Sequence, residues 1–398
     1  MQVIYISKYA AYPPYGYETR QIYISRSLVE RGMNVTLYTS TANHILSQSV
    51  SAKTETVDGI QVHWIATLSY KMPYGLRRVL SWFHFEWCLR KELKKVSLTE
   101  TDIVIVSSLS LLSIWNGIYL KKKFGSKLVF EVRDIWPAVL ERMGNISSSS
   151  ILFKLLASIE LAGYQQADKI IGTMPNLSEH VEKRLGFAKP VLWLPHLLNP
   201  NAVHTIHHSY HFKLTDLRQN AENILVGFAG SINRSSALNF FLDAAARFDS
   251  KNVHFLVLGD GALKSDYNKK YSCETIHFFD PLPQQEVVSF LKDCDILYDG
   301  YMKGDIYKYG SSRNKYIEYV SAAKPILVSY SGFLLFVEEY KCGVVVEPES
   351  VVAIDTGLRQ LLENKESWDI MGQNAIQFSA DKFQLEPQVD NLLAFINA

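Results

Sequence analysis

The chain has 398 residues, is 47% hydrophobic and carries a formal net charge of +1 at pH 7. This length exceeds what a single typical core holds and predicts two domains. The near-zero charge excludes the broad basic surface of a nucleic-acid-binding protein, so we expect no nucleic-acid partner and only local basic sites.

The first residues, 1–6, form an apolar run without the basic start of a signal peptide, so we expect a first strand there. No stretch approaches the ~20 uncharged apolar residues that a membrane span needs. The cysteines are widely spaced, which predicts reduced thiols: Cys88, Cys273, Cys294 and Cys342. The sequence therefore predicts a cytoplasmic protein that is soluble or peripheral to a membrane.

Short apolar runs alternate with helical patterns through the first half of the chain. Strands are expected at 3–7, 35–39, 61–65, 103–107, 128–132 and 170–173. Helices are expected between them at 18–31, 110–124 and 151–167. This alternation predicts a parallel sheet with crossover helices.

The alternation pauses at 194–200. A polar, histidine-rich stretch follows to about 223, and the alternation then restarts. Strands are expected at 224–228, 253–259, 275–278, 296–299, 325–329 and 344–347. Helices are expected at 236–248, 285–292, 312–322 and 351–363. We therefore predict two doubly wound α/β domains that face each other, with ligands in the cleft beyond the carboxyl ends of the strands.

The segment 309–318, Tyr-Gly-Ser-Ser-Arg-Asn-Lys-Tyr-Ile-Glu, is the most specific signal. Ser311 or Ser312 suits a helix N-cap, so we expect the helix to begin there. Its free amides and positive dipole end would face a diphosphate, and Lys315 would add a charge. Glu318 lies one turn further and suits a ribose diol. The alternative is an ordinary capped amphipathic helix.

Three further segments end predicted strands. Gly230 allows a tight turn before Arg234, which suits a phosphate, and Gly259 permits close approach of a ligand. Arg133 and Asp134 follow a strand of the first half and are expected at the cleft rim. For Arg234, the alternative is an ordinary surface arginine. For Arg133 and Asp134, the alternative is a structural salt bridge.

The loop 12–20 follows the first strand and opens a helix. Gly16 lets backbone approach a ligand, and the free amides of the helix suit an anion, although an ordinary turn remains an alternative. The loop lacks the GxGxxG spacing of a dehydrogenase dinucleotide site.

The segment 74–87 combines an apolar stripe at helical spacing with cations that continue to 95. Trp and Phe beside basic residues suit a helix lying in a lipid interface, whereas a helix packed on the core is the alternative. We expect the membrane-facing residues to be Arg77, Arg78, Trp82, Phe83 and Trp87.

No metal site is predicted. Asp293-Cys-Asp295 matches an Asp-x-Asp pattern, but Asp295 directly precedes an apolar strand, as a structural residue at a strand start often does. The four histidines between 204 and 211 fall in the expected interdomain loop, where no scaffold fixes metal ligands.

Together these segments resemble the family 4 glycosyltransferases, and most closely the bacterial subgroup that builds O-antigen and capsule repeats, including N-acetyl-fucosaminyl transferases. The resemblance covers nearly the whole chain. It rests on the order and spacing of the segments at 13–18, 131–137, 167–171, 228–230, 258–261, 309–318 and 323–325.

The resemblance implies a GT-B fold and a retaining, metal-independent transferase without a cofactor. It implies an acceptor-binding domain at 1–200, a nucleotide-sugar-binding domain at 201–381 and a final helix at 382–398 that crosses back to the first domain. The implied partners are a UDP-linked sugar, for example an N-acetylated 6-deoxyhexose, a polyprenyl-diphosphate-linked saccharide acceptor and the anionic inner face of the membrane.

The implied site has three sets of residues. The catalytic set is Arg133, Asp134, Arg234, Lys315 and Glu318. The donor-binding set is Gly16, Gly230, Ser231, Gly259, Phe279 (near the nucleobase), Ser312, Arg313 and Asn314. The acceptor-binding set is Tyr17, Glu18 and Arg20.

The chain departs from the family pattern at the donor site. Gly310 stands where the family commonly has a glutamate that touches the donor sugar, and Ser231 stands where an arginine is common. Arg234, three residues further on, is the candidate substitute for that arginine. His196 and Leu197 replace a usual Asn-Gly pair. Two alternatives therefore stay open: a GT-B sugar-nucleotide epimerase, and a non-catalytic nucleotide-sugar-binding or scaffolding partner of a glycan-assembly complex.

Overall fold

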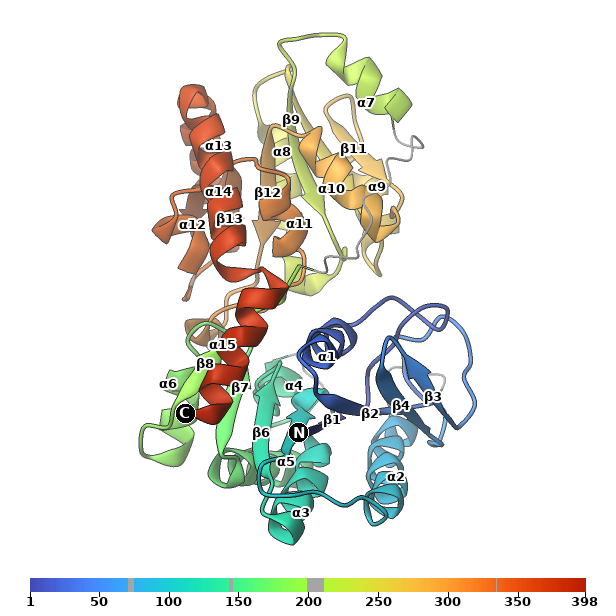
Figure 1. The fold of residues 1–398 in the computed structure, drawn as a ribbon. Helices are drawn as coiled ribbons and strands as arrows, with labels where there is room; N and C mark the ends of the chain where they lie inside the picture. Colours follow the sequence, from blue (N-terminus) through green and yellow to red (C-terminus); the bar gives the residue numbers. More distant parts are fainter. Residues whose placement is uncertain (71–74, 143–145, 199–210, 334) are drawn as a thin grey trace. The chain divides into compact units, whose positions relative to one another are not determined.

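The computed structural model describes residues 1–398 apart from 71–74, 143–145, 199–210 and 334. The chain divides into two compact units, Met1–Asn199 with Leu385–Ala398, and Pro200–Gln384 (Figure 1). The sequence places these boundaries at 200/201 and 381/382. The His204–His211 stretch lies largely outside the described residues.

The first unit is built on an eight-stranded sheet with the order β3-β4-β2-β1-β5-β6-β7-β8. Only the β3–β4 pair is antiparallel. The strands are β1 (Gln2–Ile6), β2 (Asn34–Ser40), β3 (Lys53–Val57), β4 (Ile60–Ile65), β5 (Ile103–Ser107), β6 (Lys127–Val132), β7 (Lys169–Gly172) and β8 (Val191–Trp193). Strands β3 and β8 were not expected from the sequence, because β3 (Lys-Thr-Glu-Thr-Val) is mostly polar and β8 has only three residues.

Helices cover this sheet, and α1 lies beside α15 (Figure 1). The helices of the first unit are α1 (Arg20–Glu30), α2 (Leu76–Leu93), η1 (Ser108–Ser113), α3 (Ile114–Phe124), α4 (Ala138–Arg142), α5 (Ile151–Gln166), α6 (Leu177–Leu185) and α15 (Leu385–Asn397). Arg31 of α1 pairs with Glu386 and Asp390 of α15 at 2.5 and 2.6 Å. These pairs fix the C-terminal helix to the first unit.

The second unit has a six-stranded, fully parallel sheet with the order β11-β10-β9-β12-β13-β14. Its strands are β9 (Ile224–Ala229), β10 (Val253–Leu258), β11 (Ile276–Phe279), β12 (Ile296–Gly300), β13 (Ile326–Ser329) and β14 (Gly343–Val346). Its strands lie close to the predicted ranges, because buried parallel strands form continuous apolar runs. The predicted α/β fold class, with a Rossmann-like parallel sheet in each unit, is confirmed.

The helices of the second unit pack on both faces of this sheet (Figure 1). They are α7 (His211–Arg218), η2 (Arg234–Ser236), α8 (Leu238–Arg247), α9 (Lys264–Tyr271), α10 (Gln284–Lys292), η3 (Asp305–Tyr309), α11 (Tyr316–Ser321), α12 (Leu335–Glu339), α13 (Val351–Glu363), η4 (Lys365–Ser367) and α14 (Trp368–Lys382). Within the described residues, no helix combines the length and apolar content needed to cross a membrane.

A buried ion pair and its hydrogen bonds tie four segments of the first unit together. Arg20 of α1 donates from Nε to Glu131 of β6 at 3.0 Å and from Nη1 to the carbonyl oxygen of Pro195 at 2.5 Å. The Tyr5 hydroxyl of β1 donates to the other oxygen of Glu131 at 2.9 Å. Both charged side chains are almost fully buried, so each depends on the other for compensation.

We predict that Glu131→Gln destabilises the first unit by about 3 kcal/mol, because it leaves the Arg20 charge buried without its counter-ion. The measurement is the urea midpoint of unfolding followed by far-UV circular dichroism. Asp355→Asn breaks the half-exposed Arg359–Asp355 pair and should cost less than about 1 kcal/mol. Equal effects of the two substitutions would contradict this assignment.

Candidate functional site

The loops that follow β9 and β10 run backbone to backbone at the carboxyl edge of the second sheet. The Gly230 amide donates to the Leu258 carbonyl at 3.0 Å, and the Ile232 amide donates to the Asp260 carbonyl at 2.8 Å. A Cβ on Gly259, whose φ is +142°, would lie 2.0 Å from the Gly230 carbonyl oxygen. Only glycine permits this approach, and this edge is where such sheets bind ligands.

A buried carboxylate at the end of β12 pairs with two cations beside these loops. Asp299 Oδ1 accepts from Arg313 Nη1 at 2.6 Å and from Lys315 Nζ at 2.9 Å, and the Asp299 side chain is 0% exposed. Burial alone would raise the pKa of Asp299, but the charges of Arg313 and Lys315 outweigh it and hold the pKa below its ordinary value. The cluster therefore carries one acid and two cations.

The two cations are held differently. Arg313 also donates to the carbonyl oxygens of Gly300 at 2.9 Å and Ser235 at 2.8 Å, and its guanidinium lies 3.4 Å from the Tyr301 ring centroid. The Lys315 ammonium lies 4.2 Å from the Phe228 ring centroid and 3.0 Å from where a Cβ on Gly230 would be. Lys315 thus lies at the glycine-lined edge, and burial lowers its pKa against the opposing effect of Asp299.

The helix of the 309–318 motif begins four residues later than expected. Helix α11 starts at Tyr316, with no side-chain cap, so the prediction of an N-cap at Ser311 or Ser312 is wrong. The Ser311 hydroxyl lies 2.6 Å from the Tyr301 hydroxyl, and Arg313 is bound to β12, which holds this segment outside the helix. Ser312 and Asn314 therefore lie in the segment before the helix, with Asn314 exposed.

Tyr319 anchors α11 against the sheet. Its buried hydroxyl accepts from the Ala229 amide at 3.0 Å and donates to the Tyr298 carbonyl at 2.8 Å. Glu318 on the same helix accepts from Gln284 Nε2 at 3.1 Å, and its charge acts on Lys315. The structure therefore brings Lys315, Arg313, Gly230 and Glu318 to one edge.

Other predicted donor residues lie at the margin of this edge or inside the unit. Arg234 and Ser231 are exposed, and the Arg234 charge acts on Tyr267 of α9. The carbonyl oxygen of Ser235, the residue after Arg234, accepts a hydrogen bond from Arg313. The backbone beside Arg234 therefore adjoins the cluster. Phe279 is only 9% exposed and packs edge-to-face on Phe290, so the structure gives this ring a place in the interior.

The predicted residues of the first unit lie at several places on its carboxyl edge. A Cβ on Gly16 would meet the Ile45 carbonyl at 2.8 Å, so this glycine admits the chain's own backbone. Tyr17 is exposed, Glu18 pairs with Arg26, and Arg20 is buried in the pair with Glu131. The burial of Arg20 indicates a structural role, whereas the acceptor roles of Tyr17 and Glu18 stay predictions.

Arg133 and Asp134 directly follow β6 and are half-buried. The Arg133 amide donates to Ser108 Oγ at 2.9 Å, and Thr173 Oγ1 donates to the Arg133 carbonyl at 3.1 Å. These bonds link the ends of β5, β6 and β7, as expected for a position at the carboxyl edge of the sheet. Their catalytic roles stay predictions.

Helix α2 presents a stripe of apolar side chains to solvent. The exposed residues are Leu76 (75%), Leu80 (51%), Phe83 (40%) and Trp87 (59%). Trp82 lies on the opposite face, is buried, and donates from Nε1 to Tyr9 at 2.9 Å, so its predicted membrane role is wrong. Arg78 lies one turn before Trp82 and is half-buried, with its charge acting on Lys8, so it too faces inward.

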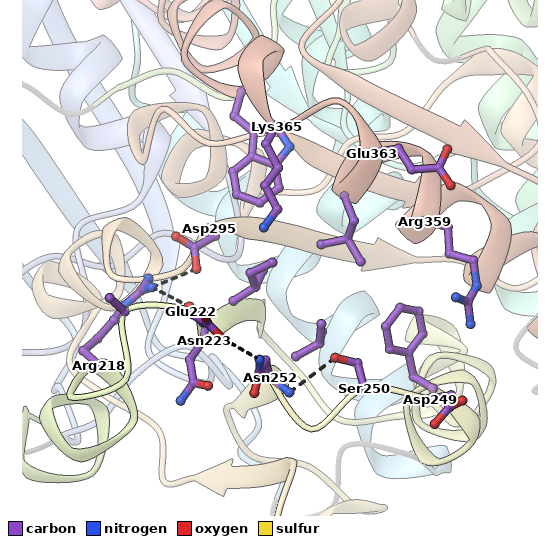
Figure 2. Close-up of a pocket in the computed structure, with 16 residues that line it drawn as sticks. Arg218, Glu222, Asn223, Asp249, Ser250, Asn252, Asp295, Arg359, Glu363 and Lys365 are labelled. Carbon is purple, nitrogen blue, oxygen red and sulfur yellow. Dashed lines mark hydrogen bonds and ion pairs between the residues drawn. The ribbon is translucent and has the colours of Figure 1, made fainter.

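A pocket of about 760 Å³ lies at the opposite, amino edge of the second sheet (Figure 2). Its ionisable lining residues are Arg218, Arg359, Lys365, Glu222, Asp249, Asp295 and Glu363. Carboxylates outnumber cations, which does not suit a diphosphate. Asp295 pairs with Arg218 at 2.9 Å and accepts from the Leu225 amide at 2.8 Å, the structural role expected at a strand start.

Residues 223–364 match the family described as "Glycosyl transferases group 1". The chain is 21% identical over 256 residues to "Probable glycosyltransferase WbjE" of Pseudomonas aeruginosa, an alignment that spans 64% of this chain and 62% of the relative. The chain therefore aligns with less than two thirds of that relative's length.

Two solved structures share the fold over nearly the whole of both chains. Sucrose-phosphate synthase from Thermosynechococcus elongatus has a TM-score of 0.74 at 14% identity and covers 100% of this chain and 98% of its own. Anabaena Alr3699/HepE, in complex with UDP and glucose, has a TM-score of 0.66 at 14% identity, with coverage of 100% and 99%.

The fold has the GT-B type of architecture, as the sequence predicts, and residues 223–364 match a glycosyltransferase family. The match covers most of the second unit, including the edge where Asp299, Arg313 and Lys315 meet. Within the described residues, no group of three or more His, Cys, Asp and Glu side chains is placed to hold a metal ion. Independence from metal stays a prediction.

We predict that Gly259→Ala costs on the order of 2–4 kcal/mol and abolishes the nucleoside-diphosphate binding that the sequence leads us to expect at this edge, because the added Cβ forces the two loops apart. Thermal unfolding and calorimetric titration with UDP measure the two effects. Gly186→Ala is the matched control: its φ is also positive, at +79°, but no atom lies within 4 Å of its Cβ. It should lose about 1 kcal/mol and leave binding intact. Unchanged UDP affinity in Gly259→Ala would contradict the site.

Proposed function

We propose that the chain transfers a sugar, with retention, from a UDP-linked donor to a lipid-diphosphate-linked glycan in O-antigen or capsule biosynthesis. The observation that carries the proposal is the Lys315–Asp299–Arg313 cluster beside the Gly230–Gly259 edge. The complex of Anabaena Alr3699/HepE with UDP and glucose supports a nucleotide-sugar donor. The acceptor class and an N-acetylated 6-deoxy donor sugar rest on the sequence resemblance.

The difficult step is departure of the nucleoside diphosphate while positive charge develops at the anomeric carbon. A cation placed where the negative charge accumulates stabilises this transition state more than the ground state. Lys315 is the residue proposed to supply it. The bond from the anomeric carbon to the diphosphate breaks as the acceptor oxygen bonds to the same face of that carbon, and the leaving phosphate takes the acceptor proton.

Peripheral attachment to the inner face of the membrane is the second part of the proposal. The α2 stripe places Leu76, Leu80, Phe83 and Trp87 on one exposed face. Arg77, Lys91 and Lys94 are exposed on the same helix or just beyond it, and the Lys91 ammonium lies 3.3 Å from the Trp87 ring centroid. Apolar side chains flanked by cations suit an interface of anionic lipids.

Lys315→Met should lower transfer by about tenfold or more, since each 1.4 kcal/mol of lost transition-state stabilisation is one decade. Product masses from UDP-sugars and a short lipid-diphosphate saccharide measure transfer. Lys292→Met removes an exposed lysine at the far end of α10 and is the control. Normal turnover in Lys315→Met would refute the site.

The same assay separates the alternatives. Release of a free epimerised sugar without acceptor consumption would indicate an epimerase. Donor binding without transfer to any acceptor would indicate a non-catalytic partner.

We predict that Lys91→Gln with Lys94→Gln weakens co-sedimentation with anionic vesicles by about tenfold or more, because each cation near the surface contributes about 1 kcal/mol. Leu80→Ser with Phe83→Ser should weaken binding to neutral vesicles as well, because it removes apolar surface that the lipid would cover on binding. Lys251→Gln with Lys292→Gln makes the same charge change on the second unit and should have no effect. Equal binding by all variants would show that α2 does not contact the lipid.

A further inference from the structure

We propose that Asp299 is a positioning residue for the donor diphosphate: it fixes Arg313 as a structural cation and holds Lys315 at the glycine-lined edge as the cation that meets the phosphates. This inference rests on the proposed function. Asp299 lies in an apolar strand, Ile296–Gly300, and its side chain is 0% exposed, so it acts through its neighbours and does not touch a ligand itself.

The contacts of Arg313 leave it little freedom to follow a ligand. Its guanidinium binds Asp299, two carbonyl oxygens and the face of Tyr301. These bonds link the end of β12 to the turn after β9 and to the segment before α11. Arg313 therefore fixes the shape of the edge, and its guanidinium planes and donors are largely used within the protein.

Lys315 differs because its ammonium has three donors on a flexible stem. Among the described residues, its hydrogen bond is the one to Asp299 at 2.9 Å, and its other close neighbours are the Phe228 ring and the Gly230 backbone. Two N–H groups thus remain at the edge where Gly230 and Gly259 admit a ligand. A diphosphate there would gain a charge-assisted bond without displacing Arg313.

Asp299 also governs the charge of Lys315. The charged and titratable groups that act on Lys315 are Asp299 of β12, Arg313 of the preceding segment and Glu318 of α11, with the Tyr319 ring at 5.6 Å. Burial and Arg313 lower the pKa of Lys315, whereas Asp299 and Glu318 raise it. Removing the Asp299 charge should therefore lower this pKa further, and Lys315 should lose its proton at a lower pH.

The test is Asp299→Asn in the full-length chain, with calorimetric titration of UDP and of uridine and with the pH profile of transfer. UDP affinity should fall by about tenfold, which is about 1.4 kcal/mol, because the charge-assisted bond from Lys315 weakens, while uridine affinity stays within about twofold. The basic limb of kcat/KM for the donor should move to lower pH. Asp355→Asn, which removes an acid from another Arg–Asp pair of the same unit, should change neither.

A second pair of variants guards against simple unfolding. Arg313→Gln with Asp299→Asn removes one charge of each sign, so the local net charge stays the same. Relative to Arg313→Gln alone, the double variant should still lose UDP affinity, because Lys315 loses its anchor. Adding Lys315→Met to Asp299→Asn should cause no further loss of UDP affinity, because the effects of residues that act as a unit are not additive.

The outcomes separate the inference from the function on which it rests. If the wild-type chain binds UDP and transfers sugar while Asp299→Asn matches it in UDP affinity and pH profile, the positioning role is wrong and the function stands. Equal loss of UDP and uridine affinity would show a purely structural role and also overturn the inference. If the wild type binds no nucleoside diphosphate, the proposed function itself fails.

Discussion

The carboxylate of Asp299, shared between Arg313 and Lys315 in the interior of the second unit, is the interaction on which the site depends. Two half-buried cations so close together would repel each other, and the effect is large where the surroundings are poorly polarisable. The Asp299 carboxylate compensates that repulsion by pairing with both cations, and the resulting bonds link β12, the turn after β9 and the segment before α11. One positive charge remains in excess, at the edge where a parallel sheet binds ligands.

The glycine contacts and the charge cluster serve one another. Gly230 and Gly259 bring the loops after β9 and β10 together, and the absence of a side chain on Gly230 leaves room for the Lys315 ammonium. The first unit uses the same kind of buried pair differently. Arg20 and Glu131 join α1, β6 and the segment after β8, and their bonds are satisfied internally. A buried pair with matched charges supports the fold, whereas one with an extra cation prepares a site for an anion.

The sequence predicts all six strands of the second sheet and six of the eight in the first, because buried parallel strands are continuous apolar runs between turn residues. It also predicts that Lys315, Gly230 and Glu318 share one edge. It places the start of α11 wrongly, since Ser311 and Arg313 are held by Tyr301 and β12, contacts that local pattern does not show. Asp299 was missed as a site residue, although an acid at the end of an apolar strand was a signal. In α2, the turn-by-turn pattern identifies the stripe but not that Trp82 and Arg78 face inward.

We propose above all that the carboxyl edge of the second sheet binds a nucleoside diphosphate. Amide hydrogen exchange of the full-length chain, with and without saturating UDP, tests it most directly. We expect slower exchange confined to 229–236, 258–264 and 310–320, the segments that surround Lys315. Protection around Arg218 and Trp368 at the amino edge, or none in the second unit, would contradict it.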